Sequence, residues 1–304
     1  MKKIALILVL ALCAVTLCGC AEISSLVTGG NGTFSGGNAE INDRIESLDI
    51  SWTAGSVKIA YHAENTVTLA ETANRTISKD EQLQWKVEGT TLKVEYMKPG
   101  VRLNSPSKHL VITLPEGISL KKVDIDCTSA DIEIPSLAAD TVILDSTSGD
   151  VSASVTAPDI TAHSTSGDVK LTAGGKVNTL GLSSTSGSLS ADLDEVSKVS
   201  ADSTSGKIRI SANMAGQLSA HSTSGSIHIA LKHFDKADIG ATSGDVTAEL
   251  PAEPGFTLKH SATSGKMTTD IPLAGSKGNY TCGDGSAQIS VGTTSGDLTV
   301  RPVK

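Results

Sequence analysis

Apolar and polar side chains alternate along most of the chain with a period of two residues. Before one Thr-Ser-Gly triplet the apolar-side positions are Ile160, Ala162 and Ser164, and beyond its glycine they resume with Val169 and Leu171. A period of two is typical of a β-strand with one buried face, because successive side chains of a strand point to opposite sides. Each copy of this pattern therefore predicts two strands joined by a sharp bend at the triplet.

The triplet recurs at nearly constant intervals, which indicates a repeat protein. Its last two residues stand at Ser148 and Gly149, Ser166 and Gly167, Ser186 and Gly187, Ser205 and Gly206, Ser224 and Gly225, Ser243 and Gly244, Ser264 and Gly265, and Ser295 and Gly296. From the first to the seventh copy, successive serines are 18 to 21 residues apart. Degenerate triplets occur at 53–55, 128–130 and 283–285.

A unit of about 19 residues with two short strands cannot enclose a core alone, so the units must stack on one another. Stacking at about 4.8 Å per strand builds two facing parallel sheets. The sequence thus predicts an all-β fold, a single-chain β-solenoid of two-strand coils in chain order. We expect the triplets to form structural corners, with glycine for a positive φ and the central serine bonding the next coil through its hydroxyl. A ligand-binding row of serines is the alternative.

The body divides into a less regular and a regular part. Residues 45–125 contain strand-like segments such as 48–52 and 109–115, and we expect irregular N-terminal coils that also cap the stack. A separate N-terminal β-sandwich is the alternative. We expect residues 126–304 to form the regular Thr-Ser-Gly solenoid. Only residues 77–84, in the less regular part, have a weak helical pattern.

The start of the chain resembles the export signal of a lipoprotein. Two lysines precede an uncharged run over 4–17, the layout of a secretory signal peptide. The run ends in Leu17-Cys18-Gly19-Cys20, which resembles the bacterial lipobox with Cys20 as the lipid acceptor. We therefore predict a signal peptide at 1–19, followed at 20–44 by the lipidated cysteine and a flexible tether rich in Gly, Ser and Asn. An ordinary cleaved signal with an incidental cysteine is the alternative.

Two cysteines, Cys127 and Cys282, remain in the body of the exported chain. Each lies two residues before the central position of a copy, an inward slot, so we expect both side chains to be buried. Stacked at the strand spacing, the two lie roughly 38 Å apart, whereas a disulfide needs Cα atoms within about 7 Å. We predict two free, unreactive thiols.

The composition excludes several classes of function. Lys and Arg total 25 against 33 Asp and Glu, a net charge of −8, which argues against a nucleic-acid partner. Aromatic residues make up 3%, too few for a row of stacked rings that binds sugars. The chain has no nucleophile elbow, phosphate-binding loop or paired-cysteine motif, so we predict no catalytic residue, no metal ligand and no cofactor.

One outward row nevertheless carries acidic and imidazole groups. The positions three residues before the central serine hold Asp126, Asp145, His163, Ser183, Asp202 and His221. Adjacent coils would place Asp145 beside His163 and Asp202 beside His221, which suits either a metal or acid–base site or solvated cross-strand pairs. We favour the cross-strand pairs. Aspartates also follow four corner glycines, but lysines fill that place in two other copies, which argues against a calcium ladder.

Together these features resemble the bacterial β-strand-repeat family of putative adhesins, a domain of unknown function. The resemblance rests on the lipobox, the early strands, the segment 110–117 and the serial Ser-Gly-Asp-Val type repeats, and it covers nearly all of the mature chain. It implies an exported, surface-held β-solenoid, sometimes linked to envelope-stress systems, and it brings no catalytic residues.

We therefore expect a non-enzymatic protein held by a lipid at Cys20 on the outer face of the cell membrane. Its role would be that of an adhesin or protein-binding scaffold with a protein or glycan partner. A regulatory or sensory lipoprotein of the envelope-stress response is the first alternative. A polysaccharide-processing β-helix enzyme is the second, and it predicts carboxylates and basic groups in an aromatic-lined groove, an enrichment that the sequence does not show.

Overall fold

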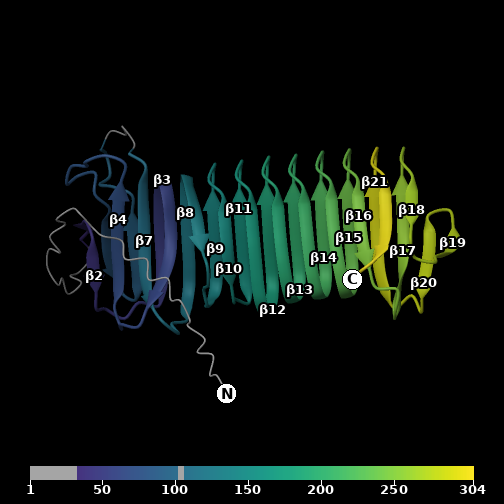
Figure 1. Cartoon of the computed structure of the whole chain (residues 1–304), viewed down its shortest axis with the longest axis horizontal. Coiled ribbons are helices and arrows are strands. Elements are labelled where there is room, and N and C mark those ends of the chain that lie inside the picture. Colours follow the sequence, from purple (N-terminus) through teal and green to yellow (C-terminus); the bar gives the residue numbers. More distant parts are fainter. Residues whose placement is uncertain (1–32, 102–105) are drawn as a thin grey trace, which may run out of the picture.

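The structure is a computed structural model that describes residues 33–101 and 106–304. Coils of β-strand are stacked along one axis, with an antiparallel cap at one end and a small hairpin at the other (Figure 1). No helix within those ranges could cross a membrane. The predicted signal peptide, the lipobox and Cys20 lie outside the described residues.

The middle of the molecule is a regular stack of parallel coils. Its strands are β8 (Leu120–Ile134), β9 (Ala139–Ser146), β10 (Val151–Val155), β11 (Asp159–Ser164), β12 (Val169–Ser184), β13 (Leu189–Ser203), β14 (Ile208–Ser222), β15 (Ile227–Ala241) and β16 (Val246–Leu250). The first half of β12 pairs with β10 and its second half with β11, so one long strand contributes to both sheets. The first sheet holds the strand halves that lead into the corners, and the second sheet holds those that leave them.

The fold is therefore all-β and solenoid-like. Strands β8, β9, β11, β12 and β10 also close a hydrogen-bonded ring, because β8 and β12 each belong to both sheets. One such ring is barrel-like in cross-section, whereas the repetition of parallel coils along the axis extends it into a stack (Figure 1).

The core fills the space between the two sheets and confirms the predicted alternation. The inward side chains Ile160, Ala162, Val169 and Leu171 are at most 2% exposed. Parallel pairing keeps equivalent residues of neighbouring coils in line, so each apolar side chain packs against its counterparts above and below. A narrow core of Val, Ile, Leu and Ala results, which explains why few aromatic rings are needed.

The corner glycines are required for a reason other than the predicted one. Seven of the eight are buried and do not have a positive φ, and only Gly265 in the outermost coil does, at 144°. A Cβ added to any of those seven would lie 1.8 to 2.1 Å from the carbonyl oxygen of the corner residue in the neighbouring coil. The prediction of a positive φ is thus wrong at these positions, and close backbone contact between coils is what excludes a side chain.

At five of the eight corners the buried hydroxyl belongs to a different serine from the one the sequence singled out. The predicted bond from a central serine hydroxyl to the next coil occurs at Ser264, whose Oγ donates to Thr294 O at 3.4 Å. All eight central serines are exposed, and their backbone N–H groups bond the neighbouring coil, as Ser186 does to Thr165 O at 3.0 Å. The serine two residues earlier is buried and accepts a hydrogen bond from the corner glycine N–H at 2.8 to 2.9 Å. This occurs at Ser146, Ser164, Ser184, Ser203 and Ser222. The bond closes the turn and satisfies a donor that would otherwise be buried alone.

The last two coils are stacked in the reverse of their chain order. The strands of this end are β17 (Gly255–Ala262), β18 (Met267–Thr269), β19 (Ala274–Ser276), β20 (Asn279–Gly283), β21 (Ala287–Thr293) and β22 (Leu298–Pro302). β21 pairs in parallel with β15 on one side and with β17 on the other, and β22 lies likewise between β16 and β18. Figure 1 shows this insertion as a yellow strand between green ones. The predicted chain-order stacking is therefore wrong here.

An antiparallel excursion makes the reversal possible. β20 pairs with both β17 and β19, and residues 283–285 form a turn instead of a degenerate corner. Cys282 on β20 consequently does not occupy the predicted slot, although its side chain is buried. Cys127 does, since it pairs with Ser146. Both thiols are free and buried, as predicted, and burial raises the pKa of Cys127 to about 12.

The opposite end is a cap of strands with both parallel and antiparallel pairing. They are β1 (Ser35–Gly36), β2 (Ala39–Ile41), β3 (Ser47–His62), β4 (Val67–Ala73), β5 (Gln84–Glu88), β6 (Thr91–Glu95) and β7 (Lys108–Pro115). β3 is a full coil that pairs in parallel with β8 on one side and with β6 and β7 on the other. β4 pairs antiparallel with β7, and β5 pairs antiparallel with β6. β2 and β1 then pair antiparallel with β4 and β5, respectively. The first coil is thus covered by segments that follow it in the chain.

Two sequence expectations fail in this cap. Residues 35–41, predicted to belong to the tether, form β1 and β2 and place Ile41 in the core. Burial of this one apolar side chain and pairing with β4 outweigh the glycine-rich composition around it. Residues 78–82 form a single turn, closed by Glu81 N–H to Ser78 O at 3.0 Å, and not a helix.

A buried ion pair holds the cap together. Lys108 has a fully buried side chain, and its Nζ donates to Glu71 Oε2 at 2.9 Å, to Glu81 O at 2.8 Å and to Tyr96 O. The ammonium group also lies 4.9 Å from the ring centroid of Trp52 and 4.2 Å from that of Tyr96. Burial lowers the pKa of Lys108, an effect that Glu71 opposes. Three acceptors for three N–H donors make this a fully satisfied buried charge.

Candidate functional site

An open groove of about 770 Å³ runs along the outer face of the first sheet, beside the corners. Its upper side is formed by corner threonines, one from each coil: Thr185, Thr204, Thr223, Thr242, Thr294 and Thr263. Its floor is part of the outward row that the sequence predicted. In the order of the stack this row reads Asp126, Asp145, His163, Ser183, Asp202, His221, Gly240, Gly292 and Ser261.

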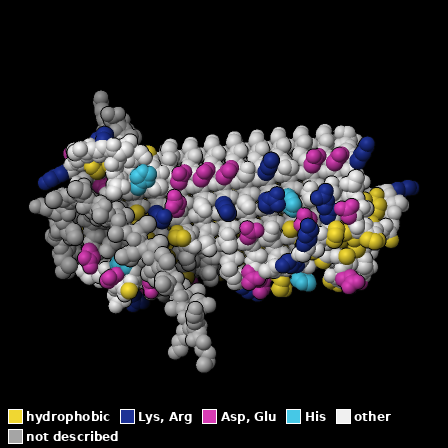
Figure 2. Space-filling view, in the orientation of Figure 1, with side chains coloured by type: hydrophobic (Ala, Val, Ile, Leu, Met, Phe, Trp, Pro, Cys, Tyr) yellow, Lys and Arg dark blue, Asp and Glu magenta, His cyan; other side chains and the backbone are white. Residues whose placement is uncertain are grey.

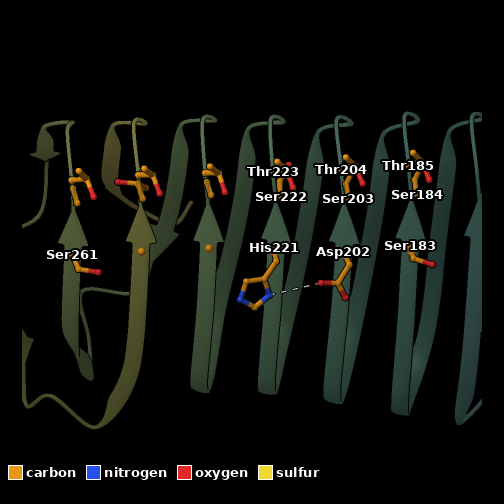
Figure 3. A pocket seen from close by; sticks show the side chains of 18 of the residues that line it. Ser183, Ser184, Thr185, Asp202, Ser203, Thr204, His221, Ser222, Thr223 and Ser261 are labelled. Carbon is orange, nitrogen blue, oxygen red and sulfur yellow. Dashed lines mark ion pairs between the residues drawn. The ribbon is translucent and has the colours of Figure 1, made fainter.

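His221 projects from the middle of the groove (Figure 3). Its Nδ1 lies 3.9 Å from Asp202 Oδ1 and its Nε2 lies 3.8 Å from Asp238 Oδ2, while the Ser219 hydroxyl is 3.2 Å from Nδ1. The predicted neighbours Asp202 and His221 are confirmed. These distances describe loose, solvated pairs, because the side chains of His221, Asp202 and Asp238 are all exposed.

The second predicted pair is arranged differently. Asp145 and His163 do face each other on paired strands, but the imidazole Nδ1 is bonded to Ser183 Oγ at 2.8 Å. Among the described residues no ion pair within 4.0 Å joins Asp145 to His163. Burial raises the pKa of Asp145, and His163 partly opposes that shift.

Asp145, His163 and Ser183 follow one another on consecutive coils, which invites comparison with a catalytic triad. The carboxylate does not reach the imidazole, so it cannot orient the ring as a triad requires. The backbone N–H groups of these strands are engaged in parallel pairing, and they are not gathered into an oxyanion hole. The geometry therefore gives Ser183 a hydrogen-bonding role and does not support a nucleophilic one.

Two glycines open the floor of the groove. Gly240 and Gly292 lie on adjacent coils, where the absence of side chains leaves a hollow. A Cβ at Gly292 would have Ser261 Oγ as its nearest neighbour at 3.7 Å, whereas one at Gly240 would lie 2.6 Å from the His221 ring. The sequence shows both glycines but cannot bring them together, since they become neighbours only through the inserted C-terminal coil.

The lining of the groove is polar and nearly neutral. It consists chiefly of hydroxyl groups, with two histidines, one aspartate and no Lys, Arg or aromatic residue. Hydroxyls both donate and accept hydrogen bonds. Within 33–101 and 106–304 there is no cluster of three or more His, Cys, Asp or Glu residues suited to a metal ion. The surface is therefore best adapted to a ligand that itself carries many hydroxyl or amide groups.

Aspartates form a separate ladder just beyond the corners. The N–H of Asp150 donates to Asp131 Oδ1 at 2.9 Å, that of Asp168 to Asp150 Oδ1 at 2.8 Å and that of Ser188 to Asp168 Oδ1 at 2.7 Å. Figure 2 shows acidic side chains in line along this edge of the coils. Each carboxylate bonds the backbone of the next coil, so the row has a structural function.

The predicted corner residues all line this edge. The triplets from Ser148 and Gly149 through Ser243 and Gly244 stand on successive coils, followed in space by Ser295 and Gly296 and then by Ser264 and Gly265. Six of their threonines, from Thr185 onward, border the groove, whereas their glycines are the points of coil-to-coil contact.

One protein-family model matches residues 39–301, which span nearly all of the stack and its cap. The chain belongs to that family, Toastrack DUF4097. The family resemblance stated from the sequence is thereby confirmed for this Toastrack protein. No curated protein matches it.

Several solved structures are similar to this Toastrack chain. A putative lipid binding protein from Parabacteroides distasonis is 16% identical, with 90% of this chain and 98% of the other covered and a TM-score of 0.46. A putative adhesin from Bacteroides fragilis is 11% identical, with coverages of 90% and 98% and a TM-score of 0.41. A putative adhesin from Parabacteroides merdae is 12% identical, with coverages of 91% and 99% and a TM-score of 0.35.

Proposed function

We propose that this Toastrack protein is a non-enzymatic, lipid-anchored surface protein that binds an extended glycan in the groove of the first sheet. The observation that carries the proposal is the row of corner hydroxyls, one per coil, beside the open floor at Gly240 and Gly292. A rigid stack presents these groups at a constant spacing, so a linear ligand lying along the axis meets the same chemistry at each step.

The lining favours a glycan over a protein as the ligand. Protein interfaces are dominated by Trp, Tyr and Arg anchors in desolvated pockets, and none of these residues lines the groove. Hydroxyl groups such as those of Thr204 and Thr223 match the donors and acceptors of a sugar chain. Without stacked rings each contact is weak, so firm adhesion requires many copies bound at once on the same surface.

The non-enzymatic part of the proposal rests on the residues that come closest to a catalytic arrangement. Ser183 and His163 are hydrogen-bonded, but neither an orienting carboxylate nor an oxyanion hole accompanies them. The His221 ring lies between the exposed carboxylates of Asp202 and Asp238, at 3.9 and 3.8 Å, and neither forms a close hydrogen bond with it. We expect bound glycan to be released intact after incubation, as judged by its unchanged chain length on chromatography.

The lipid anchor is proposed from the motif at Cys20 and places the protein on the outer face of the cell membrane. Replacement of Cys20 by Ala should move the protein from the membrane fraction to the soluble exported fraction. The measurement is fractionation of cells with and without detergent. Continued detergent-dependent recovery of the C20A variant would count against the anchor.

The groove is tested by filling its floor. Gly292→Leu adds a side chain over the hollow, and the nearest atom to its Cβ is 3.7 Å away, so the fold should tolerate it. We expect binding of cell-wall glycans to protein-coated beads to fall about tenfold or more, the loss that follows when contact along the floor is blocked.

Gly181→Leu is the matched control, because Gly181 is also an outward glycine of the first sheet, lies outside the groove and has its nearest neighbour at 3.8 Å. It should bind as the wild type does. Equal binding by both leucine variants would refute the groove as the site. If only protein partners are captured in a groove-dependent way, the surface is a protein interface and the glycan assignment is wrong.

A further inference from the structure

The inserted C-terminal coil, residues 287–302, is held by non-covalent contacts on both sides. It comprises β21, the corner at Gly296 and β22, and it lies between the coils that carry Gly244 and Gly265. We infer that the slot it fills also accepts the same coil from a second copy of this chain, so that two copies exchange C-terminal coils. The inference goes beyond the proposed function and does not depend on it.

The slot has two edges that recognise a Thr-Ser-Gly-Asp coil. On the inner side, Ser295 N–H donates to Thr242 O at 2.9 Å and Asp297 N–H donates to Asp245 Oδ1 at 2.9 Å. On the outer side, Lys266 N–H donates to Asp297 Oδ1 at 2.7 Å. The Asp297 carboxylate therefore links the inserted coil to the outer one, while its own N–H bonds the inner one.

Shape adds to this recognition. A Cβ on Gly296 would lie 2.0 Å from Gly244 O, so the coil that enters must have glycine at its corner. Its inward side chains Ile289, Val291, Leu298 and Val300 are all buried against the core. An unfilled slot would expose the apolar ends of two coils, which favours capture of another identical coil.

The outer side of the slot is the less complete one. His260 Nε2 and Thr293 Oγ1 are buried without a hydrogen-bond partner among the described residues. In the outer coil Ala262 and Gly265 are exposed, although their equivalents Ala241 and Gly244 in the next coil but one are buried. The unsatisfied polar atoms and the exposure of the outer coil weaken the contact between the outer and inserted coils. The insert can therefore leave its slot from this side.

The connection to the insert is suited to exchange. Residues 283–286 are largely exposed, and Gly283 and Gly285 have positive φ values of 56° and 71°. Among the described residues no strand follows β22, so no later strand of this stretch holds the insert in its slot. A second copy fits because exchange of an identical element reproduces every contact of the closed form, and two copies satisfy each other symmetrically.

The test uses cysteines at the corner positions of adjacent coils. Ser243→Cys is introduced in one preparation of the chain and Ser295→Cys in another, both with Cys20 replaced by Ser to keep the protein soluble. Neighbouring parallel strands lie about 4.8 Å apart, within the Cα range of a disulfide. Insertion of the S295C coil into the S243C copy therefore gives a covalent dimer after mixing at high concentration and oxidation. We expect at least a threefold excess of dimer over the control mixture on non-reducing gels.

The control mixture pairs the S243C copy with a chain that carries Ser186→Cys, an exposed corner serine in the middle of the stack that cannot enter the slot. A single chain carrying both S243C and S295C should close internally and lose the ability to exchange. The inference would be overturned if the S243C and S295C mixture gave no more covalent dimer than the S186C control while the double variant formed its internal disulfide. Dimer that forms equally with the internally closed chain would also overturn it.

Discussion

Replacing Gly187 by valine is expected to destabilise the protein by about 3–5 kcal/mol, near the upper end for single substitutions. A Cβ at this corner would lie 1.9 Å from Gly167 O and 2.5 Å from its carbonyl carbon. Both obstacles are backbone atoms of the neighbouring coil, so no change of rotamer can relieve the overlap and the two coils must separate. The measurement is the free energy of unfolding in urea at 25 °C.

The effect should spread along the stack, because coils stabilise one another through nearest-neighbour contacts. Gly181→Val is the control: Gly181 lies in β12, the strand that leads into this corner, and its added Cβ would be 3.8 Å from Thr161 Oγ1. Valine also suits an extended strand. We expect a change within about 0.5 kcal/mol there. Similar stabilities for the two valine variants would contradict the close-contact role of the corner.

Removing the Lys108 ammonium group should lower the free energy of unfolding by an amount similar to that expected for Gly187→Val. In Lys108→Met the buried Glu71 carboxylate loses its cation, and the carbonyl groups of Glu81 and Tyr96 lose a donor. Breaking a buried ion pair by removing one partner costs about 3–5 kcal/mol. The loss should appear in urea unfolding as a lower midpoint.

A second substitution separates the charge effect from simple loss of packing. In Lys108→Met combined with Glu71→Leu the stranded carboxylate is absent, so the double variant should be more stable than Lys108→Met alone by about 1 kcal/mol or more. Leu83 N–H, which donates to Glu71 Oε1 at 2.8 Å, sets a limit to this recovery because it loses its acceptor. Strict additivity of the two single losses would show that the pair is not energetically coupled.

The repeat made much of the fold predictable from local patterns. The alternation around Ile160 and Val169 fixed which side chains face the core, and it placed Cys127 in the inward slot opposite Ser146. It also aligned Asp202 with His221 across neighbouring strands. These predictions succeeded because strand periodicity and equal coil length determine the register without further information.

Other features depended on contacts between segments far apart in the chain. Glu71 and Lys108 are 37 residues apart, and neither belongs to a repeat that would suggest their pairing. The groove floor is completed by Gly240 and Gly292, which the chain order separates by a whole additional coil. The interval from Ser264 to Ser295 exceeds every other spacing between successive triplets. It indicates an excursion, but not the direction in which the chain returns.

The sequence alone determined that this protein is a stack of two-strand coils with glycine corners and an alternating core, because those properties follow from the period of a strand and the size of a side chain. Only the tertiary structure decided the order of the last coils, the cap with its buried ion pair and the shape of the groove. The reason is that all coils of this repeat offer nearly the same edges to one another, so local sequence permits several orders. The selection among them depends on how each end of the stack covers its exposed core and unpaired backbone groups.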